Sequence, residues 1–315
     1  MINDIPKRST VAPGQPTSAS EPTNADADRR SAPTRARRRR GLSPKRLRRA
    51  GSYVLLVAVA VIVLWPFLFL LSTALKPATQ DVFSFPPTLI PHPPVITWFR
   101  DAWTEIPFPR YLLNSLLYVA FGLPLFVIVS AMTAYPLATM RFRGRTLMFF
   151  VFLSTMFVPA ELMLIPRFLV VSRLGLTNTY AGVVLPGVLS AFGIFLLRQA
   201  FASVPPELAE AARLDGCGEL RLFWNVMLPV VRPTLAIASI FGFIFIWNDF
   251  IWPLVVLNDN SKYPIALGVA YLSGISGTDT RTLSAGTVIS LVPIVLFFIV
   301  LQRQVLEGAK GAVKG

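Results

Sequence analysis

Two groups of polar residues interrupt a chain that is otherwise strongly apolar, and they are the residues whose types and spacing suggest chemistry. The first group lies between Val204 and Pro233, in the sequence VPPELAEAARLDGCGELRLFWNVMLPVVRP. The second group consists of Glu161, Asn248 and Asp249, which lie inside apolar stretches. Acidic side chains inside a membrane span are costly and commonly mark the path of a solute. The first group has the pattern of a docking segment instead.

The polar stretch predicts two short helices separated by a turn. Ser203 is the expected N-cap, and Pro205 and Pro206 suit a first helical turn, where their missing N–H groups are not needed. Gly216 is expected to end this helix, because glycine readily adopts the left-handed cap conformation. A second amphipathic run extends from Glu219 to Met227.

The expected first helix carries a face suited to close contact with another protein. Glu207 and Glu210 lie near its N-terminus, where the helix dipole favours negative charge. Leu208, Ala211 and Ala212 share one face by their i, i+3, i+4 spacing, and the two alanines allow close approach. The plainer interpretation is an ordinary connection between two membrane helices, which does not account for so many patterned positions.

This stretch resembles the EAA loop of permease subunits in binding-protein-dependent ATP-binding-cassette (ABC) importers. The family pattern is Glu-Ala-Ala, then Asp-Gly two residues later, then a Phe and a Leu-Pro. The resemblance assigns ATPase coupling to Glu207, Glu210, Ala211, Ala212, Asp215, Gly216, Phe223, Leu228, Pro229 and Pro233. Cys217 departs from the pattern, because the family usually has a small residue such as alanine there.

The resemblance extends from about Leu56 to Gly315 and includes PFPRYLLNSLLYVA, AYPLATMRFRGR and WNDFIWPLVVL. It is closest to carbohydrate-type permeases that share a fold with the smaller permease of the maltose importer. It implies four kinds of partner: a second homologous permease, two ATPase subunits, an extracytoplasmic solute-binding protein and the lipid bilayer. It implies no cofactor on this chain, because ATP and Mg²⁺ are used by the ATPase subunits.

Composition supports a multi-pass membrane protein without catalytic activity of its own. The 315 residues are 54% hydrophobic and only 15% charged, with a mean hydropathy of +0.59, which is far from the usual soluble composition. The single Cys217 excludes an internal disulfide, and the single His92 excludes a histidine metal cluster. No G-x-x-x-x-G-K-[ST] phosphate loop and no catalytic triad is present, so ATP hydrolysis is expected in a partner.

The predicted fold is an all-α membrane protein with six transmembrane helices and the EAA loop between the fourth and fifth. Residues 1–50 are basic and poor in large apolar residues, so we expect a disordered cytoplasmic tail that touches lipid headgroups rather than nucleic acid. Residues 51–315 form the expected permease domain. Its expected spans, each near the ~20 residues that cross a bilayer, are 53–72, 112–138, 147–166, 180–200, 234–256 and 283–302.

The distribution of basic residues orients these spans. With the N-terminus inside, 23 of the 30 Lys and Arg residues fall in inner segments and 7 in outer segments. Basic residues accumulate on the cytoplasmic side of a membrane. We therefore expect a protein of the inner (cytoplasmic) membrane with both termini and the stretch Val204–Pro233 in the cytoplasm.

Glu161 and Asp249 fall about 14 to 15 residues into the third and fifth spans, which places both about 22 Å from the cytoplasmic side. A role in lining a solute path and a position at the outer interface both fit this depth. Asn248 is the better candidate for contacting sugar hydroxyls. Most of the aromatic residues near it, at 241, 243, 245, 247, 250 and 252, are expected to pack or to face lipid.

The predicted function is therefore the permease subunit of an ATP-driven importer for a sugar or related polyol. A non-sugar solute such as a glycerophosphate is an alternative within the same class. An ion-coupled secondary transporter is disfavoured, because it would need embedded charges in repeated halves, and a membrane anchor without transport would not need proline-broken spans.

Overall fold

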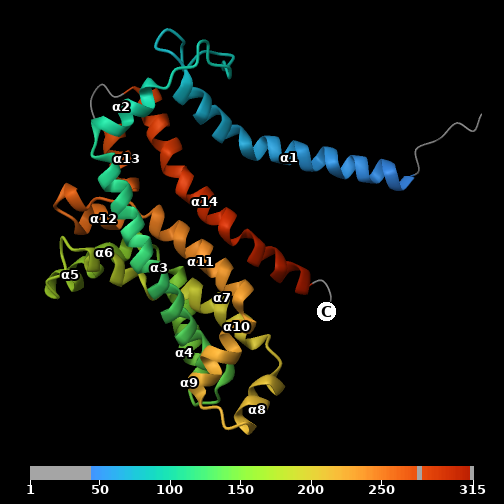
Figure 1. The fold of residues 1–315 in the computed structure, drawn as a ribbon. Helices are drawn as coiled ribbons and strands as arrows, with labels where there is room; N and C mark the ends of the chain where they lie inside the picture. Colours follow the sequence, from blue (N-terminus) through green and yellow to red (C-terminus); the bar gives the residue numbers. More distant parts are fainter. Residues whose placement is uncertain (1–43, 275–278, 313–315) are drawn as a thin grey trace, which may run out of the picture. The chain divides into compact units, whose positions relative to one another are not determined.

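The computed structural model describes residues 44–274 and 279–312, and all regular structure in these residues is helical (Figure 1). The expected tail, residues 1–50, lies mostly outside the described residues. The chain divides into two units, Met1–Leu56 and Val57–Gly315. Only the first turns of α1 (Pro44–Leu75) are described in the first unit. The arrangement below is that of the second unit.

The remaining elements follow one another with short connections. They are α2 (Thr97–Glu105), α3 (Phe108–Thr139), α4 (Arg145–Ser154), η1 (Thr155–Phe157), η2 (Ala160–Met163), α5 (Leu164–Arg173), α6 (Tyr180–Val184), η3 (Leu185–Gly187), α7 (Ala191–Ala202), α8 (Pro206–Leu214), α9 (Glu219–Leu222), η4 (Phe223–Met227, a π-helical turn), α10 (Leu228–Val230), α11 (Arg232–Trp247), α12 (Ile251–Val256), η5 (Asn260–Lys262), α13 (Ile265–Gly274) and α14 (Thr280–Ala312).

Three described helices are long and apolar enough to cross a membrane by themselves: Gly51–Leu75 of α1, Phe108–Thr139 and Thr280–Gln304 of α14. Three further pairs of helices pass the same test together but are bent at a short break. These pairs are Arg145–Phe157 with Ala160–Arg173, Tyr180–Gly187 with Ala191–Ala202, and Glu219–Val230 with Arg232–Trp247. The described chain therefore has three straight candidate spans, or up to six if each bent pair crosses once.

Two of the stretches expected as continuous helices are broken near their polar residues. The axis bends by 102° at Val158-Pro159, where Val158 is extended. A residue before proline avoids the helical region, and proline supplies no N–H for the ladder. The stretch 234–256 is likewise interrupted between Trp247 and Ile251. Each break places a polar residue at a helix end.

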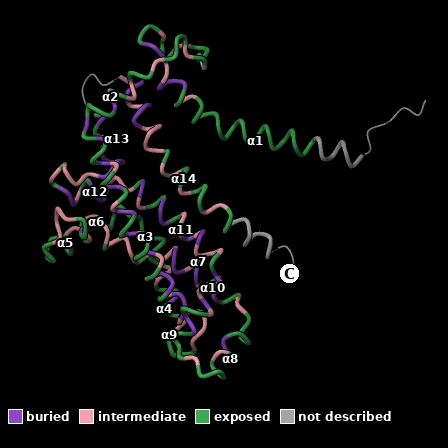
Figure 2. The backbone as a smooth tube through the Cα atoms, in the orientation of Figure 1, coloured by how far each residue is buried: buried purple, intermediate pink, exposed green. Residues whose placement is uncertain are grey.

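Helix α3 is the centre of the packing, with α7 and α11 against it and α14 against α11 (Figure 1). Glycines allow the closest approaches: a Cβ on Gly193 of α7 would lie 2.6 Å from Ser130 Oγ, and one on Gly242 of α11 would lie 2.8 Å from the Phe126 ring. Small residues at helix crossings are the usual means of tight packing in membranes. Buried residues follow these contacts, whereas residues 57–68 of α1 expose their apolar side chains (Figure 2).

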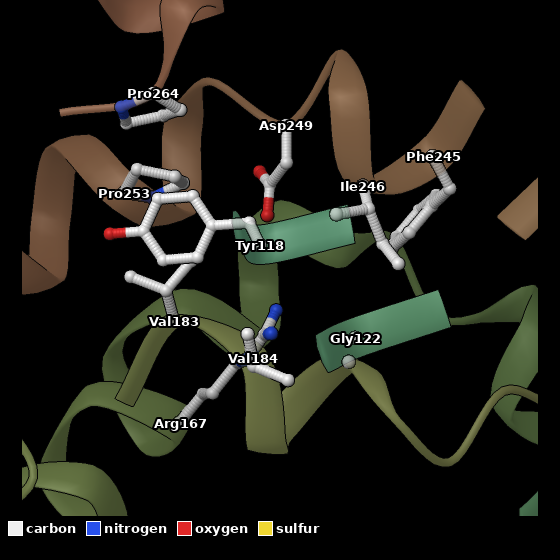
Figure 3. Close-up of a pocket in the computed structure, with 11 residues that line it drawn as sticks. Tyr118, Gly122, Arg167, Val183, Val184, Phe245, Ile246, Asp249, Pro253 and Pro264 are labelled. Carbon is white, nitrogen blue, oxygen red and sulfur yellow. The ribbon is translucent and has the colours of Figure 1, made fainter. Parts of the chain in front are cut away.

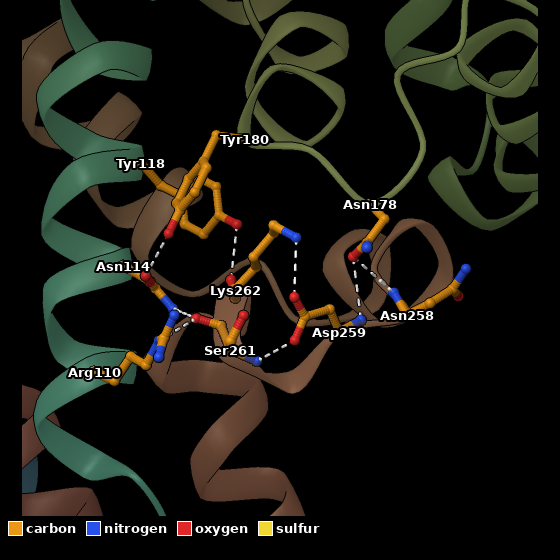
Figure 4. A network of polar contacts seen from close by, with 9 residues as sticks. All are labelled: Arg110, Asn114, Tyr118, Asn178, Tyr180, Asn258, Asp259, Ser261 and Lys262. Atoms are coloured by element: carbon orange, nitrogen blue, oxygen red, sulfur yellow. Dashed lines mark hydrogen bonds and ion pairs between the residues drawn. The ribbon is translucent and has the colours of Figure 1, made fainter.

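A polar network fixes the connection between α12 and α13 to the rest of the fold (Figure 4). The buried Asn114 amide donates to Ser261 O and Tyr263 O, at 2.9 Å each, and its oxygen accepts from Tyr180 Oη at 2.7 Å. Tyr118 Oη donates to Lys262 O at 2.8 Å. Helix α3 thus holds this connection directly, with α6 supporting Asn114, through buried, satisfied hydrogen bonds, which rigidify a structure.

Candidate functional site

The EAA loop folds as two short helices with a glycine cap between them. Helix α8 begins at Pro206 with Pro205 as its N-cap, so the expectation of a Ser203 cap is wrong. Ser203 instead ends α7 and donates its hydroxyl to Ala200 O. Pro205 can take the capping position because the missing N–H of Pro206 needs no partner in the first turn.

Gly216 ends α8 in the expected left-handed conformation, with φ of +77°. Its N–H donates to Arg213 O and the N–H of Cys217 donates to Ala212 O, at 3.0 Å each. This pair of bonds is the Schellman motif, which satisfies the last carbonyls of a helix. Cys217 packs with Ala212 against the neighbouring apolar core, so a somewhat larger side chain than alanine is accommodated there.

One polar chain ties both helices of the loop to α3. Arg213 Nε donates to Glu219 Oε1 at 2.8 Å, and Tyr135 Oη donates to Glu219 Oε2 at 2.8 Å. The Tyr135 ring lies against Phe201 and Phe223, with centroids 5.7 and 5.2 Å away. The Arg213 hydrogen bond holds the pKa of Glu219 below its usual value, because it stabilises the carboxylate form. The loop is thus attached to α3 by polar and aromatic contacts.

The sequence-predicted coupling residues divide into an inward and an outward set. Phe223 is buried in the core cluster of this region, and Ala212 and Leu228 pack against it. Pro229 and Pro233 occupy the first turns of α10 and α11. The outward set, all exposed, is Glu207, Glu210, Ala211, Asp215 and Gly216. Ala209 and Ala212 therefore face the core, whereas Leu208 and Ala211 of the expected alanine face are exposed.

Exposed apolar side chains surround the outward set. Leu214 is 89% exposed and Leu220 70% exposed, and Leu208 and Trp224 are each more than two-fifths exposed. Glu210 also lines a cavity of about 690 Å³ with Arg141 of the turn before α4 and Arg145, the first residue of α4. These exposed apolar side chains form a rim with charged residues between them. Such a composition is typical of protein-docking surfaces.

The second site is a cavity of about 500 Å³ between the two helix breaks. Its lining residues are Ala160, Glu161, Leu164, Arg167, Ile244, Phe245, Asn248, Asp249, Phe250, Ile251 and Trp252. The structure therefore brings together all three predicted path residues, although 87 positions separate Glu161 from Asn248 in the sequence. Asp249 Oδ1 accepts from Trp252 N at 3.3 Å, in the first turn of α12.

Arg167 is the cavity residue that the sequence did not single out, because position 167 follows the expected end of the third span and was counted among outer charges. Figure 3 shows a smaller enclosed cavity next to the first, where Arg167 and Asp249 point toward one another from opposite walls. The guanidinium carbon lies 4.1 Å from the centroid of the Trp252 ring. The sequence signal that could have identified Arg167 is a basic residue directly after proline in the apolar run LIPRFLVV.

The aromatic residues near Asn248 divide into packing and cavity-lining members, whereas the sequence predicts that most of them pack or face lipid. Phe243 and Trp247 stack in the core with centroids 5.4 Å apart, and Phe241 packs against Phe192. Phe245, Phe250 and Trp252 line the cavity. Among the described residues, no three His, Cys, Asp or Glu side chains gather where they could hold a metal ion.

Residues 107–306 match the model of the family described as "Binding-protein-dependent transport system inner membrane component". This match covers more than half of the chain, and the chain belongs to this family of membrane permeases. It has a helical, membrane-embedded architecture in common with them, and such permeases are transport subunits rather than enzymes.

Individual relatives carry saccharide and glycerophosphate names. The "Arabinooligosaccharides transport system permease protein AraQ" of Halalkalibacterium halodurans is 35% identical over 266 residues, covering 82% of this chain and 93% of that protein. The "sn-glycerol-3-phosphate transport system permease protein UgpE" of Yersinia pestis is 32% identical and covers 81% and 94%. A chain of a bacterial ABC transporter involved in import of the acidic polysaccharide alginate superposes with a TM-score of 0.69, at 26% identity over 82% and 96%.

Proposed function

We propose that this chain is one of two permease subunits of an ATP-driven sugar importer, and that the EAA loop transmits the closure of the ATPase subunits to the solute path. A second homologous permease completes the pore, and an extracytoplasmic binding protein delivers the solute. ATP and Mg²⁺ belong to the ATPase subunits, because this sequence has no phosphate loop.

The exposed apolar rim of the EAA loop carries this proposal. Leu214 and Leu220 lie on either side of the Gly216 cap and are largely exposed, while the inner face of the same loop is bonded to α3 through Glu219 and Tyr135. A rigidly attached segment with an uncovered apolar tip is built to dock and to transmit force. The cavity with Glu161, Asn248 and Asp249 supports a solute path in the same chain.

Reconstitution tests the function directly. The purified complex of this permease, its partner permease, the ATPase subunits and the binding protein is placed in vesicles, and uptake of labelled oligosaccharides is measured with and without ATP. We expect uptake only with ATP and loaded binding protein. Uptake driven by an ion gradient alone would instead identify a secondary transporter. The absence of uptake for every solute would indicate a membrane anchor without transport activity.

The six-span topology with both termini in the cytoplasm gives a prediction of its own. A reporter fused after Lys314 should signal from the cytoplasm, and one inserted between Gly274 and Asp279, in the connection from α13 to α14, should signal from outside. The reason is the excess of basic residues in the inner segments. An external C-terminus would contradict the topology, because the EAA loop would then face away from any ATPase.

Glu219→Gln should loosen the attachment of the EAA loop to α3. Its lowered pKa means that the carboxylate stabilises the folded loop at pH values above the usual Glu range, and that this contribution is lost as the pH falls through the lowered pKa. The Arg213 pair is partly exposed, so we expect at most about a fivefold loss of ATPase affinity, in line with the ~0–1 kcal/mol of such pairs. Pull-down of the ATPase between pH 7 and 4 measures this.

The matched control is Arg221→Gln, an exposed residue on the same helix. It should keep both the wild-type affinity and the wild-type pH profile. If Glu219→Gln weakens with falling pH as the wild type does, then another group titrates and the assigned role of Glu219 is wrong.

A further inference from the structure

Arg167 has hydrogen-bonding groups that the described protein does not use. Its side chain is half-buried, and its Nε lies in the interior without a hydrogen-bond partner. No described residue accepts a hydrogen bond from its guanidinium, and no ion pair joins it to Asp249 or Glu161 in the described part of the chain. A guanidinium has five donors in a fixed plane, and an unsatisfied buried donor needs an explanation.

The guanidinium is nevertheless held in a defined orientation. It lies over the Trp252 ring at 4.1 Å, an attractive arrangement for a cation and an aromatic face. The ring itself is 2% exposed, and its Nε1 donates to Gly182 O at 3.0 Å. The hydrogen bond to Gly182 therefore fixes the position of Trp252. Because Arg167 stacks on this fixed ring, its donors face the cavity without needing to be ordered by a ligand.

The cavity lining also supplies acceptors, from Asp249 and Asn248 at the break after α11 and from Glu161 on the same bent segment as Arg167. Asp249 and Glu161 are carboxylates, which accept only, and Asn248 offers an amide that donates and accepts. Phe245 and Phe250 add apolar faces to the same lining. Donors, acceptors and aromatic faces in one lining match a molecule that carries many hydroxyl groups and apolar C–H faces. The volume of about 500 Å³ lies within the range of small-molecule sites.

The charges of the lining distinguish between neutral and anionic solutes. One guanidinium faces two carboxylates, so the described lining has an excess of one negative charge. Like charges repel at close range, so a uronate or a phosphate ester is disfavoured relative to a neutral sugar. The excess of acceptors favours the neutral polyol, which can donate to both carboxylates.

We propose that Arg167, stacked on Trp252, is a solute-contacting and specificity-determining residue, and that its cavity takes a neutral polyhydroxylated solute. This inference rests on the proposed transport function. It assigns the sugar hydroxyls to the Arg167 donors and to the acceptors of Asp249, Glu161 and Asn248.

Direct binding to the solubilised permease complex, without the binding protein, tests the inference. Saturation-transfer NMR measures the binding of neutral di- and trisaccharides, of matched uronate oligosaccharides and of glycerol 3-phosphate. We expect the wild type to bind neutral saccharides at least tenfold more tightly than either anion. Arg167→Lys keeps the charge but loses the planar fork, and we expect a loss of at least tenfold for neutral saccharides in Arg167→Lys and in Arg167→Gln. The double variant Glu161→Gln with Asp249→Asn leaves one positive charge and should reverse the preference toward anions.

Controls separate this role from a structural one and from failure of the transport function. Arg173→Gln changes an exposed residue at the end of the same helix and should match the wild type. The melting temperature of the Arg167→Lys complex should also match, because a purely structural residue would lower it instead. Wild-type saccharide binding by both Arg167 variants, or tighter binding of anions by the wild type, would overturn the inference even if ATP-driven uptake is intact. Absence of ATP-driven uptake in the reconstituted wild type would overturn the proposed function instead.

Discussion

Gly216→Val should separate the ATPase from the permease while leaving the permease in the membrane. Gly216 has a φ of +77°, a conformation that a β-branched residue resists, at a cost of about 1–3 kcal/mol. The substituted loop can relieve this strain only by breaking the Schellman motif, which moves α9 relative to α8. Leu214 and Leu220, on either side of the cap, then no longer form one surface. We expect at least a tenfold loss of ATPase recovered by pull-down, and a similar loss of ATP hydrolysis stimulated by the binding protein.

Gly218→Ala is the matched control for this experiment. Gly218 lies two residues away with a φ of −67°, and a Cβ there would meet nothing within 4 Å. It should therefore retain ATPase binding. Equal loss of ATPase binding in both variants would mean that the loop tolerates no side chain at either position. Wild-type ATPase binding in both variants would mean that the EAA loop only connects two membrane helices.

Glu210→Lys examines the charge of the same surface. Glu210 is exposed on α8 and lines the cavity that also contains Arg141, Arg145 and Arg213, so a lysine adds a fourth cation there. Truncating one partner of a buried interfacial charge pair costs about 2–5 kcal/mol. We expect the affinity of the permease for the ATPase to fall by an amount that corresponds to this free energy. Membrane insertion should be unchanged.

Gly193→Val should prevent the assembly of the permease itself. The Cβ at this position would lie 2.6 Å from Ser130 Oγ and 3.0 Å from the Phe126 ring, both on α3. The two helices would have to separate at the most extensive helix contact in the described fold. Overpacking of a tight core costs about 1–3 kcal/mol, and occasionally more. We expect a severe loss of monodisperse complex after solubilisation and a lower melting temperature in the remainder.

A compensating change distinguishes steric conflict from other causes. Gly193→Ala combined with Ser130→Gly removes the atoms that the new methyl group would contact most closely, so the double variant should recover part of the stability lost in Gly193→Ala. Neighbouring sites that share a contact are expected to be non-additive. Additive losses would show that the contact with Ser130 at the crossing of α3 and α7 is not what requires glycine there.

The sequence by itself determined the class of protein and the local structure of the EAA loop. The apolar content indicated a membrane protein, and the pattern from Glu207 to Pro233 indicated the permease family. The glycine cap was predictable at Gly216 because a left-handed residue is a local property of the backbone. The mistaken cap at Ser203 has a local cause as well, because Pro206 suits the first helical position and so α8 begins there, with Pro205 as its N-cap.

Tertiary structure decided which distant residues form the cavity. Glu161 and Asp249 were recognisable as unusual, since an isolated acid in an apolar run is visible in the sequence. Arg167 was not, because it appeared to lie beyond the end of a straight span. The 102° bend after Val158 places α5 beside the break at Asn248. The periodicity of a sequence describes single helices, and it does not predict how two broken helices pack together. The stacking of Arg167 on Trp252 depends on packing between segments 85 positions apart, and that packing is a property of the whole helical assembly.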